Sequence, residues 1–567
     1  MDDNSVFPVT TAAKRGFTVS YKNKTLLSAV DPIAQALRAV NEAGKLDRTL
    51  YVCPSPLLGY GLNELLSLIS TDSAVLCVET DKKLFSLSAS SIEEKVLQHP
   101  RFALVSITDG TELFKYLREK WGARAFRRIE TIKLSGGWQL DSACYAEMED
   151  TIRSGFAIDW GNAMTIVKLG RRFMYNVIRN IRLMDQTLPM AELSFGSKPV
   201  LVLGAGPSLD TVLDSFLDAG VFDRHKTLNG HAGKKIAVVC VDTCLPVLKA
   251  RGIVPDLAVI LESQFWNLSD FLGSKNSCVP AAVDLTACPP SVQILGGPVY
   301  FFCTPWTTLR FFKRLSDAGL MPHLLPPLGS VGLSAVELAM HISSGQIITG
   351  GIDFSFTLDS FHARSSPAHL SQLLSRSRFL SSFNTEAVFR DGVFTAFSKS
   401  NKPVKSNPAM RTYRNLFENE FSGGRVKDIE GSGLPLGVET LKINDAIKIL
   451  LNETNNNQNH DEEKQTMVTK QNMHASWTKI TNFFKKEKVM LENLRSLLVG
   501  DDSTENNTET LDALIDNADY LWAHFPDCAG AEGRRPPVTD LGFLKRVRAE
   551  IDPFIKLWKL AERENTV

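Results

Sequence analysis

"KPVLVLGAGPSLD", residues 198–210, decides the fold of the central part of this chain. Its apolar run Val200–Leu203 is typical of a buried strand, and the glycines after that run allow a tight turn. Ser208 then begins a helical pattern, "SLDTVLDSFLDAG". A buried strand, a glycine turn and a helix in this order indicate a parallel α/β sheet.

The same alternation of strand and helix continues through the middle of the chain and predicts a doubly wound domain over residues 191–440. The expected strands are Val200–Leu203, Ile236–Val241, Leu257–Leu261, Ala281–Val283, Val299–Phe302 and Ile347–Thr349. The expected helices are Ser208–Leu217, Leu245–Arg251, Thr307–Ala318 and Ser334–His341.

Two further regions flank this domain. Residues 1–190 contain the strand patterns "RTLYVCP", "SAVLCVE" and "RFALVS", followed by a helical connector over about 140–190. Residues 441–567 are helical in pattern and include a polar linker, 452–465. The expected fold class is therefore α/β, with two Rossmann-like doubly wound domains in tandem and a C-terminal helical domain.

Composition excludes several classes of partner. Lys plus Arg and Asp plus Glu both number 63, so charge gives no reason to expect a nucleic acid or an anionic membrane. The first residues have no apolar signal, and no apolar run is long enough to span a bilayer, so we expect a cytoplasmic protein without a transmembrane segment. The nine cysteines form no C-x-x-C pair, which favours reduced thiols over a zinc site.

The glycine turn is a candidate ligand site, because ligands of open α/β sheets bind beyond the carboxyl ends of the strands. Gly204 and Gly206 let the backbone approach a ligand closely, and the helix from Ser208 offers free N–H groups at its positive end. An anion such as a phosphate is the expected guest. The alternative is that the turn only connects a strand to a helix.

Polar residues also follow the next two expected strands. Asp242 and Thr243 end one strand, where an acid would hold a ribose in a dinucleotide enzyme, and Glu262 ends the other. Because the turn lacks the third glycine of the dinucleotide fingerprint, NAD is disfavoured. Asp242 could equally cap the helix that follows it.

The last strand edge supplies a second candidate anion site and a candidate base. Gly329 and Ser330 begin a helix, whose N-terminus favours anions. The following strand leads to Gly351 and Asp353, and then to His362, whose ordinary pKa near neutrality suits a general base. An ordinary surface histidine is the alternative for His362.

Taken together and in order, these segments resemble the motility-associated factor (Maf) glycosyltransferases. The resemblance rests on "VLVLGAGPSLD", "VDTCLPVLKARGIVPDLAVILE" and "GSVGLSAVELAMHISSGQIITGGIDFSFTLDSFHA", and extends over residues 15–450. The central domain of that family is also called 6-hydroxymethylpterin diphosphokinase MptE-like. The same segments are similar to bacterial sialyltransferases that use CMP-sialic acid.

The resemblance implies transfer of a nonulosonic sugar, such as pseudaminic or legionaminic acid, from a CMP donor to Ser or Thr hydroxyls of flagellin. It implies His362 and Asp353 as catalytic residues, no certain cofactor, and leaves a divalent cation such as Mg²⁺ open. The expected donor-binding residues are Gly204, Ala205, Gly206, Pro207, Ser208, Asp242, Thr243, Glu262, Gly329, Ser330, Gly351 and Ser355.

Two departures keep other functions open. Ala205 stands where the sialyltransferases have Asn, and Ser355 where they have a Tyr that steadies the leaving phosphate, so Tyr413 or a cation would have to replace it. One alternative is a non-catalytic flagellin-binding assembly factor. A second is an ATP-dependent transferase similar to the pterin diphosphokinases. A third is an S-adenosylmethionine site in the N-terminal domain.

Overall fold

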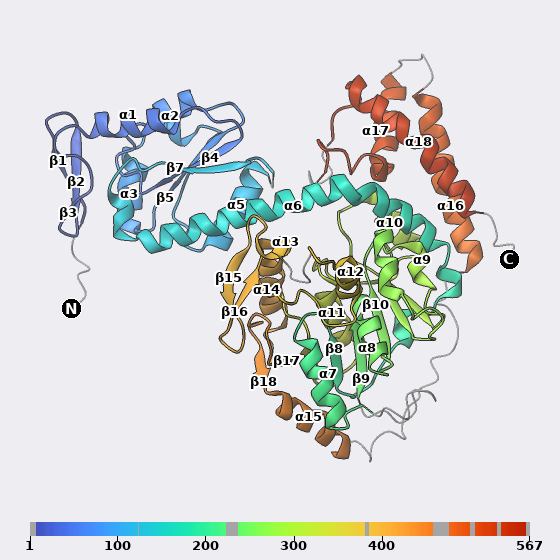
Figure 1. The fold of residues 1–567 in the computed structure, drawn as a ribbon. Coiled ribbons are helices and arrows are strands. Elements are labelled where there is room, and N and C mark those ends of the chain that lie inside the picture. The colour runs from blue at the N-terminus through green and yellow to red at the C-terminus, as the bar shows by residue number, and fades with distance from the viewer. Residues whose placement is uncertain are drawn as a thin grey trace. The chain divides into compact units, whose positions relative to one another are not determined.

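The computed structural model forms two compact units. Unit 1 comprises residues 1–168 and 523–536, and unit 2 comprises residues 169–522 and 537–567. The boundary falls within α6 (Ser142–Ile181), the helix that the sequence predicts as a connector (Figure 1). The structure describes residues 7–122, 124–222, 236–379, 385–456, 476–498, 505–529 and 535–562.

Unit 1 is built on a parallel sheet with the strand order β6-β5-β4-β7. Because both faces of this sheet are covered by apolar clusters, β4 and β5 are fully buried, as expected in a parallel sheet, whereas the edge strand β7 exposes Arg128 and Glu130. A small antiparallel meander, β1-β2-β3, precedes it. The strands are β1 (Val9–Ala12), β2 (Phe17–Tyr21), β3 (Lys24–Thr25), β4 (Thr49–Pro54), β5 (Ala74–Val78), β6 (Phe102–Val105) and β7 (Arg128–Thr131). The helices are α1 (Pro32–Ala43), α2 (Leu62–Leu68), α3 (Lys82–Ser91), α4 (Glu94–Leu97) and α5 (Gly110–Trp121).

Unit 2 contains a sheet with the order β13-β12-β11-β10-β9-β8-β14-β17-β18, in which every neighbouring pair is parallel. The six strands that the sequence predicts are confirmed to within a residue at each end. They are β8 (Val200–Leu203), β9 (Ala237–Val241), β10 (Leu257–Ile260), β11 (Ala281–Asp284), β12 (Val299–Cys303) and β14 (Ile347–Gly350). The sequence analysis missed β13 (His323–Leu324), β17 (Val426–Ile429) and β18 (Glu439–Leu441).

Helices cover this sheet and join its strands, and a two-stranded ribbon, β15 (Phe394–Phe397) and β16 (Pro403–Ser406), lies outside it. The four helices predicted from sequence are confirmed as α7 (Leu209–Asp218), α8 (Leu245–Ala250), α10 (Arg310–Asp317) and α11 (Val331–Ile342). The remaining helices up to the end of the sheet are α9 (Pro289–Val292), α12 (Pro367–Ser375), α13 (Thr385–Val388) and α14 (Pro408–Phe421).

The strand order changes direction at β8, and we call this position the crossing point of the sheet. The chain moves outward from β8 to β13 on one side, and α11 then returns it to β14 on the other side of β8. The ends of β8 and β14 are in register, with Leu203 opposite Gly350. In open α/β sheets the crevice at such a crossing point is the usual ligand position.

The C-terminal helices belong to unit 2, so the compact units are two where the sequence analysis expects three domains. The reason is a shared aromatic core: Phe311 of α10 packs edge-on against Phe483 and Tyr520. A salt bridge from Arg314 to Glu487 joins the same elements. The helices are α16 (Trp477–Leu497), α17 (Glu505–Asn517) and α18 (Leu541–Ala561).

Three remaining expectations concern the linker, the cysteines and the membrane. Residues 452–456 of the expected linker are the end of α15 (Ile443–Asn456), and 457–465 lie outside the described residues. All nine cysteines are free thiols. Among the described helices, none combines the length and the apolar character that a membrane crossing requires.

Candidate functional site

The glycine turn after β8 packs directly against the loop after β14. The amide of Gly204 donates to the Gly350 carbonyl at 2.9 Å, and that of Gly206 donates to the Gly351 carbonyl at 2.8 Å. A Cβ on Gly204 or on Gly206 would lie 2.6 Å from the Gly351 oxygen, closer than van der Waals contact allows. Glycine is therefore required at both positions, and the two strand ends form one rigid edge.

Asp353 holds this turn through hydrogen bonds to Ser208. Its Oδ2 accepts from the Ser208 amide at 2.7 Å and its Oδ1 accepts from the Ser208 hydroxyl at 2.5 Å, and both residues are buried. The carboxylate thus occupies the N-terminus of α7, where the sequence analysis expects the phosphate of a ligand. Because both of its oxygens accept from Ser208, Asp353 positions the turn, and its expected role as a catalytic residue stays a prediction.

His362 lies over the same turn. The Ala205 carbonyl accepts from the Ala363 amide at 2.9 Å, and the His362 Nδ1 lies 3.3 Å from the same oxygen. Since a carbonyl can only accept, Nδ1 carries the proton and Nε2 is the basic nitrogen of the neutral ring. Burial lowers the pKa of His362, although the Ala205 carbonyl opposes this shift. The imidazole is therefore neutral at pH 7, as a general base must be.

Asp210, whose role was not predicted from the sequence, anchors the loop that carries His362. Its Oδ2 accepts from the Arg364 amide at 2.9 Å, and its Oδ1 pairs with Arg251 at 2.7 Å. Asp210 lies in the first turn of α7, where a negative charge is favourable. The loop that carries His362 is thereby fixed relative to the glycine turn.

The N-terminus of α11 forms the third wall of the site. Ser330 is its N-cap residue but makes no side-chain hydrogen bond to the first turn. Ile352 connects this helix to the turn, because its side chain lies 3.0 Å from a Cβ on Gly204 and 3.7 Å from a Cβ on Gly332. The glycine turn and the first turn of α11 therefore lie against the same side chain, that of Ile352.

Tyr413, on α14, lies beside this helix terminus. A Cβ on Gly329, whose φ is +72°, would be 3.1 Å from the Tyr413 ring. The ring also lies 6.2 Å, centroid to centroid, from that of Phe354. Burial raises the pKa of Tyr413, so the phenol keeps its proton and can act as a hydrogen-bond donor.

The Ser355 hydroxyl has a partner within the protein. Its side chain is buried, and its hydroxyl donates to the Ser432 carbonyl at 3.0 Å. This hydrogen bond joins the loop after β14 to the loop after β17, and the expected role of Ser355 in donor binding stays a prediction. Close packing requires glycine in the latter loop too, since a Cβ on Gly431 would lie 2.6 Å from that of Ser208.

A buried ion pair, whose acidic member lies on β17, is next to Asp353. Lys399 pairs with Asp428, and the Thr349 hydroxyl donates to the same carboxylate at 2.8 Å. Burial raises the pKa of Asp428 to about 6, although Lys399 opposes the shift. Since Lys399 is already paired, it supports the strand ends and is not an open ligand site for an anion.

The residues after β9 and β10 form a separate acidic cluster. Thr243 donates to Asp242 through its amide at 2.9 Å and to Asp270 through its hydroxyl at 3.0 Å. Asn267 lies within 3.4 Å of both carboxylates. The charge of Glu262 acts on Asp270, whose pKa is raised mainly by burial. Asp242 and Thr243 are thus brought together with Asp270, which sequence reasoning missed, and Glu262 is close enough for its charge to act on Asp270.

This cluster predicts an unusual pH dependence of stability. Burial, and to a smaller extent the charge of Asp270, raise the pKa of Asp242 to about 7. The protonated carboxyl therefore contributes fully to the stability of the folded protein at low pH, and this contribution is lost as the pH rises through 7. We expect Asp242→Asn to raise the free energy of unfolding at pH 8, relative to wild type, by up to about 4 kcal/mol, with little effect at pH 4. Urea denaturation at both pH values measures this.

Asp218→Asn, an exposed substitution on α7, is the control and should change neither value. An Asp242→Asn effect that is equal at pH 4 and pH 8 would show that this carboxyl titrates normally in the folded protein.

In unit 1, the acidic residue that follows β5 is Glu79, and its carboxylate is hydrogen-bonded by other side chains of the protein. Glu79 is buried and accepts from the Ser55 hydroxyl at 2.6 Å and from the Tyr145 hydroxyl at 3.2 Å. Burial raises its pKa. Because its carboxylate is already satisfied, Glu79 is not placed to hold a ribose. Across the described residues, no three His, Cys, Asp or Glu side chains converge to hold a metal ion.

The chain is similar to known proteins in sequence and in fold. Residues 172–359 match the family model described as 6-hydroxymethylpterin diphosphokinase MptE-like. The chain is 29% identical, over 98% of its own length and 96% of its relative's, to an uncharacterized protein of Treponema pallidum (strain Nichols). Its fold resembles that of a MAf glycosyltransferase from Magnetospirillum magneticum AMB-1, with a TM-score of 0.51, 13% identity and coverage of 98% of this chain and 92% of that chain.

The chain is thus an α/β protein whose central parallel sheet has its crossing point at β8. Its residues 172–359 are similar to the MptE-like family model, and its fold is similar to that of the MAf glycosyltransferase.

Proposed function

We propose that the chain is a glycosyltransferase that moves a nonulosonic sugar from a CMP donor to Ser or Thr hydroxyls of flagellin. The observation that carries the proposal is the convergence of the 204–208 turn, the N-terminus of α11 and His362 at the crossing point of the sheet. The fold shared with a MAf glycosyltransferase supports the transferase class. The donor, the acceptor and a role in motility follow from the family resemblance.

Each wall of the site has a part in this proposal. The phosphate of the donor lies at the N-terminus of α11, because the Asp353 carboxylate already occupies that of α7. Gly206 and Pro207, the partly exposed residues of the turn, lie beside the nucleotide. His362 Nε2 takes the proton from the acceptor hydroxyl as the oxygen attacks the anomeric carbon and CMP leaves. Asp353 and Asp210 hold these loops in place.

The family model favours a second candidate, an ATP-dependent pterin diphosphokinase. One experiment separates the two functions. The purified chain is incubated with flagellin and a CMP-nonulosonate, and separately with ATP and 6-hydroxymethylpterin. The proposal predicts CMP release and a matching increase in the mass of flagellin. AMP formation from the second mixture alone would establish the kinase, and tight flagellin binding with neither product would establish an assembly factor.

Tyr413 should assist departure of the nucleotide, since its protonated phenol lies beside the N-terminus of α11. We expect Tyr413→Phe to lower kcat by about 10- to 100-fold, the loss of one hydrogen bond to developing charge, with little change in KM for the donor. Steady-state CMP release measures both constants. Tyr300→Phe is the control, because burial also raises the pKa of Tyr300, which lies on β12. Equal rates for Tyr413→Phe and wild type would remove Tyr413 from the mechanism.

A further inference from the structure

A cavity of about 620 Å³ lies in unit 2, away from the site described above. It is bounded by the segment 184–194, by Phe301 of β12, by residues 319–323 and by the C-terminal end of α11. Ser330 is at the opposite end of this 12-residue helix. At 1.5 Å per residue the two ends are about 16 Å apart, so the cavity is a separate site.

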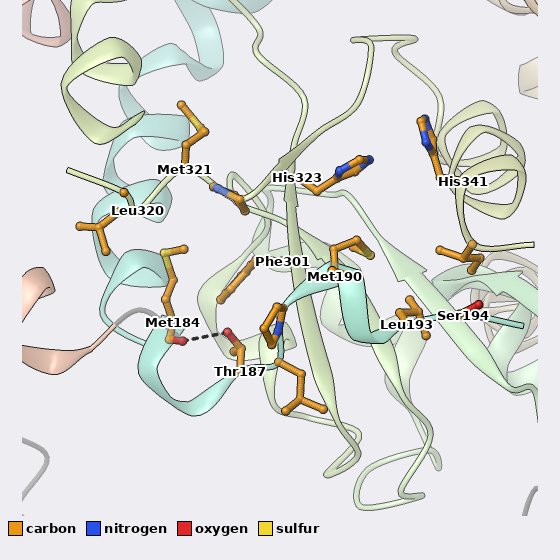
Figure 2. A pocket seen from close by; sticks show the side chains of 16 residues that line it. Met184, Thr187, Met190, Leu193, Ser194, Phe301, Leu320, Met321, His323 and His341 are labelled. Carbon is orange, nitrogen blue, oxygen red and sulfur yellow. Dashed lines mark hydrogen bonds between the residues drawn. The ribbon is translucent and has the colours of Figure 1, made fainter. Parts of the chain in front are cut away.

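Most of the side chains that line the cavity are apolar, and three of them are methionines. Figure 2 shows Met184, Leu320 and Met321 on one side, with Phe301 and Met190 beside them. Methionine side chains are flexible and polarizable, so they adapt to ligands of irregular shape. The volume is within the range of about 300–1,000 Å³ that is typical of small-molecule sites.

The two hydroxyl side chains of the wall are engaged by the protein. The Thr187 hydroxyl donates to the Met184 carbonyl at 3.1 Å, the dashed line in Figure 2, and the Ser194 hydroxyl accepts from the Gly196 amide at 3.2 Å. Among the described residues that line the cavity, none is Asp, Glu, Lys or Arg. A ligand with a buried charge would therefore find no compensating charge here.

One polar edge remains, formed by two histidines. The rings of His323 and His341 lie 5.0 Å apart, edge to face, and His341 Nε2 lies 3.1 Å from a carboxylate oxygen of Glu337. The carboxylate disfavours an anion at this edge, whereas imidazole can bond to a neutral hydroxyl or carbonyl.

We propose that this cavity binds an uncharged molecule with an alkyl body and one hydrogen-bonding group, whose alkyl body lies against the methionines and whose polar group meets the histidine pair. The occupant is a small molecule of the fatty-alcohol class, and its binding does not depend on the proposed transferase activity.

The test uses the full chain and a series of alkan-1-ols from octanol to dodecanol. Each alcohol displaces the uncharged fluorophore N-phenyl-1-naphthylamine, and dodecanoate is the charged comparison. We expect saturable displacement, with affinity rising about fourfold for each added CH₂ group. Dodecanoate should bind at least about tenfold more weakly than dodecanol, because of its charge. Absence of saturable displacement, or tighter binding of dodecanoate, would overturn the proposal.

The location is tested with methionine methyl groups labelled with ¹³C. Dodecanol should shift the signals of Met184, Met190 and Met321, and leave that of Met340, a half-buried residue of α11 outside the cavity wall, in place. Met190→Gln and Met321→Gln should each weaken binding at least about fivefold, by placing an amide against the alkyl chain. Met340→Gln is the matched control. Shifts only outside the three cavity methionines would contradict the assignment even if a variant fails to fold.

Discussion

Replacing His362 with alanine should lower the rate of sugar transfer by about 10²- to 10⁴-fold, the usual contribution of a positioned general base. CMP binding should stay unchanged, because the histidine bonds to the Ala205 carbonyl and not to the nucleotide in our proposal. Single-turnover transfer to flagellin measures the rate, and calorimetric titration with CMP measures the binding.

The dependence on pH supplies an independent check. The pKa of His362 is lowered by burial, so the wild-type kcat/KM should stay constant above pH 6.5 and decrease only below it, as the ring becomes protonated. In His362→Ala this acid limb should disappear. His99→Gln, which removes another histidine whose pKa burial lowers, should leave both the rate and the pH profile unchanged. If the decrease in kcat/KM at low pH persisted in His362→Ala, a group other than His362 would be responsible for it.

Gly206→Ala should have the largest effect on the architecture of the site. Its Cβ would lie 2.5 Å from Asp353 Oδ2 and 2.6 Å from the Gly351 carbonyl oxygen, and neither atom can move without breaking the hydrogen bonds that join the strand ends. We expect a loss of about 3 kcal/mol in the free energy of unfolding, typical of overpacking at a rigid site, together with loss of CMP binding. Chemical denaturation and calorimetry measure the two effects.

Gly423→Ala is the matched control, because no atom lies within 4 Å of its Cβ position and its φ is not in the left-handed region. It should leave CMP binding unchanged and the stability unchanged or slightly higher. If Gly206→Ala were as stable as Gly423→Ala and bound CMP normally, the contact between the turn and the loop after β14 would not define the site.

Much of the fold could be predicted from the sequence because its central strands are continuous apolar runs. β8, β9 and β10 are buried on both faces, and such runs are easily recognised. β17 escaped prediction because its sequence, "VKDI", contains two charged residues. It is a buried strand nonetheless, since Lys399, distant in sequence, pairs with Asp428.

The candidate site also has a part that could be predicted from the sequence and a part that could not. The strand ends that carry Gly204, Asp242 and Gly351 are where a parallel sheet must place them, so their common edge could be predicted from the sequence. The roles of individual side chains were less accessible, because they depend on contacts between distant segments. Asp353 lies 145 residues from Ser208, and only the folded chain shows that these two residues satisfy each other.

The central claim is that the crossing point of the unit 2 sheet binds a cytidine nucleotide. Hydrogen exchange of the full chain with and without saturating CMP tests it most directly. We predict slower exchange in peptides that contain residues 204–208 and 329–333, and no change in those that contain residues 184–194. Protection confined to other segments, or none at all, would contradict the account.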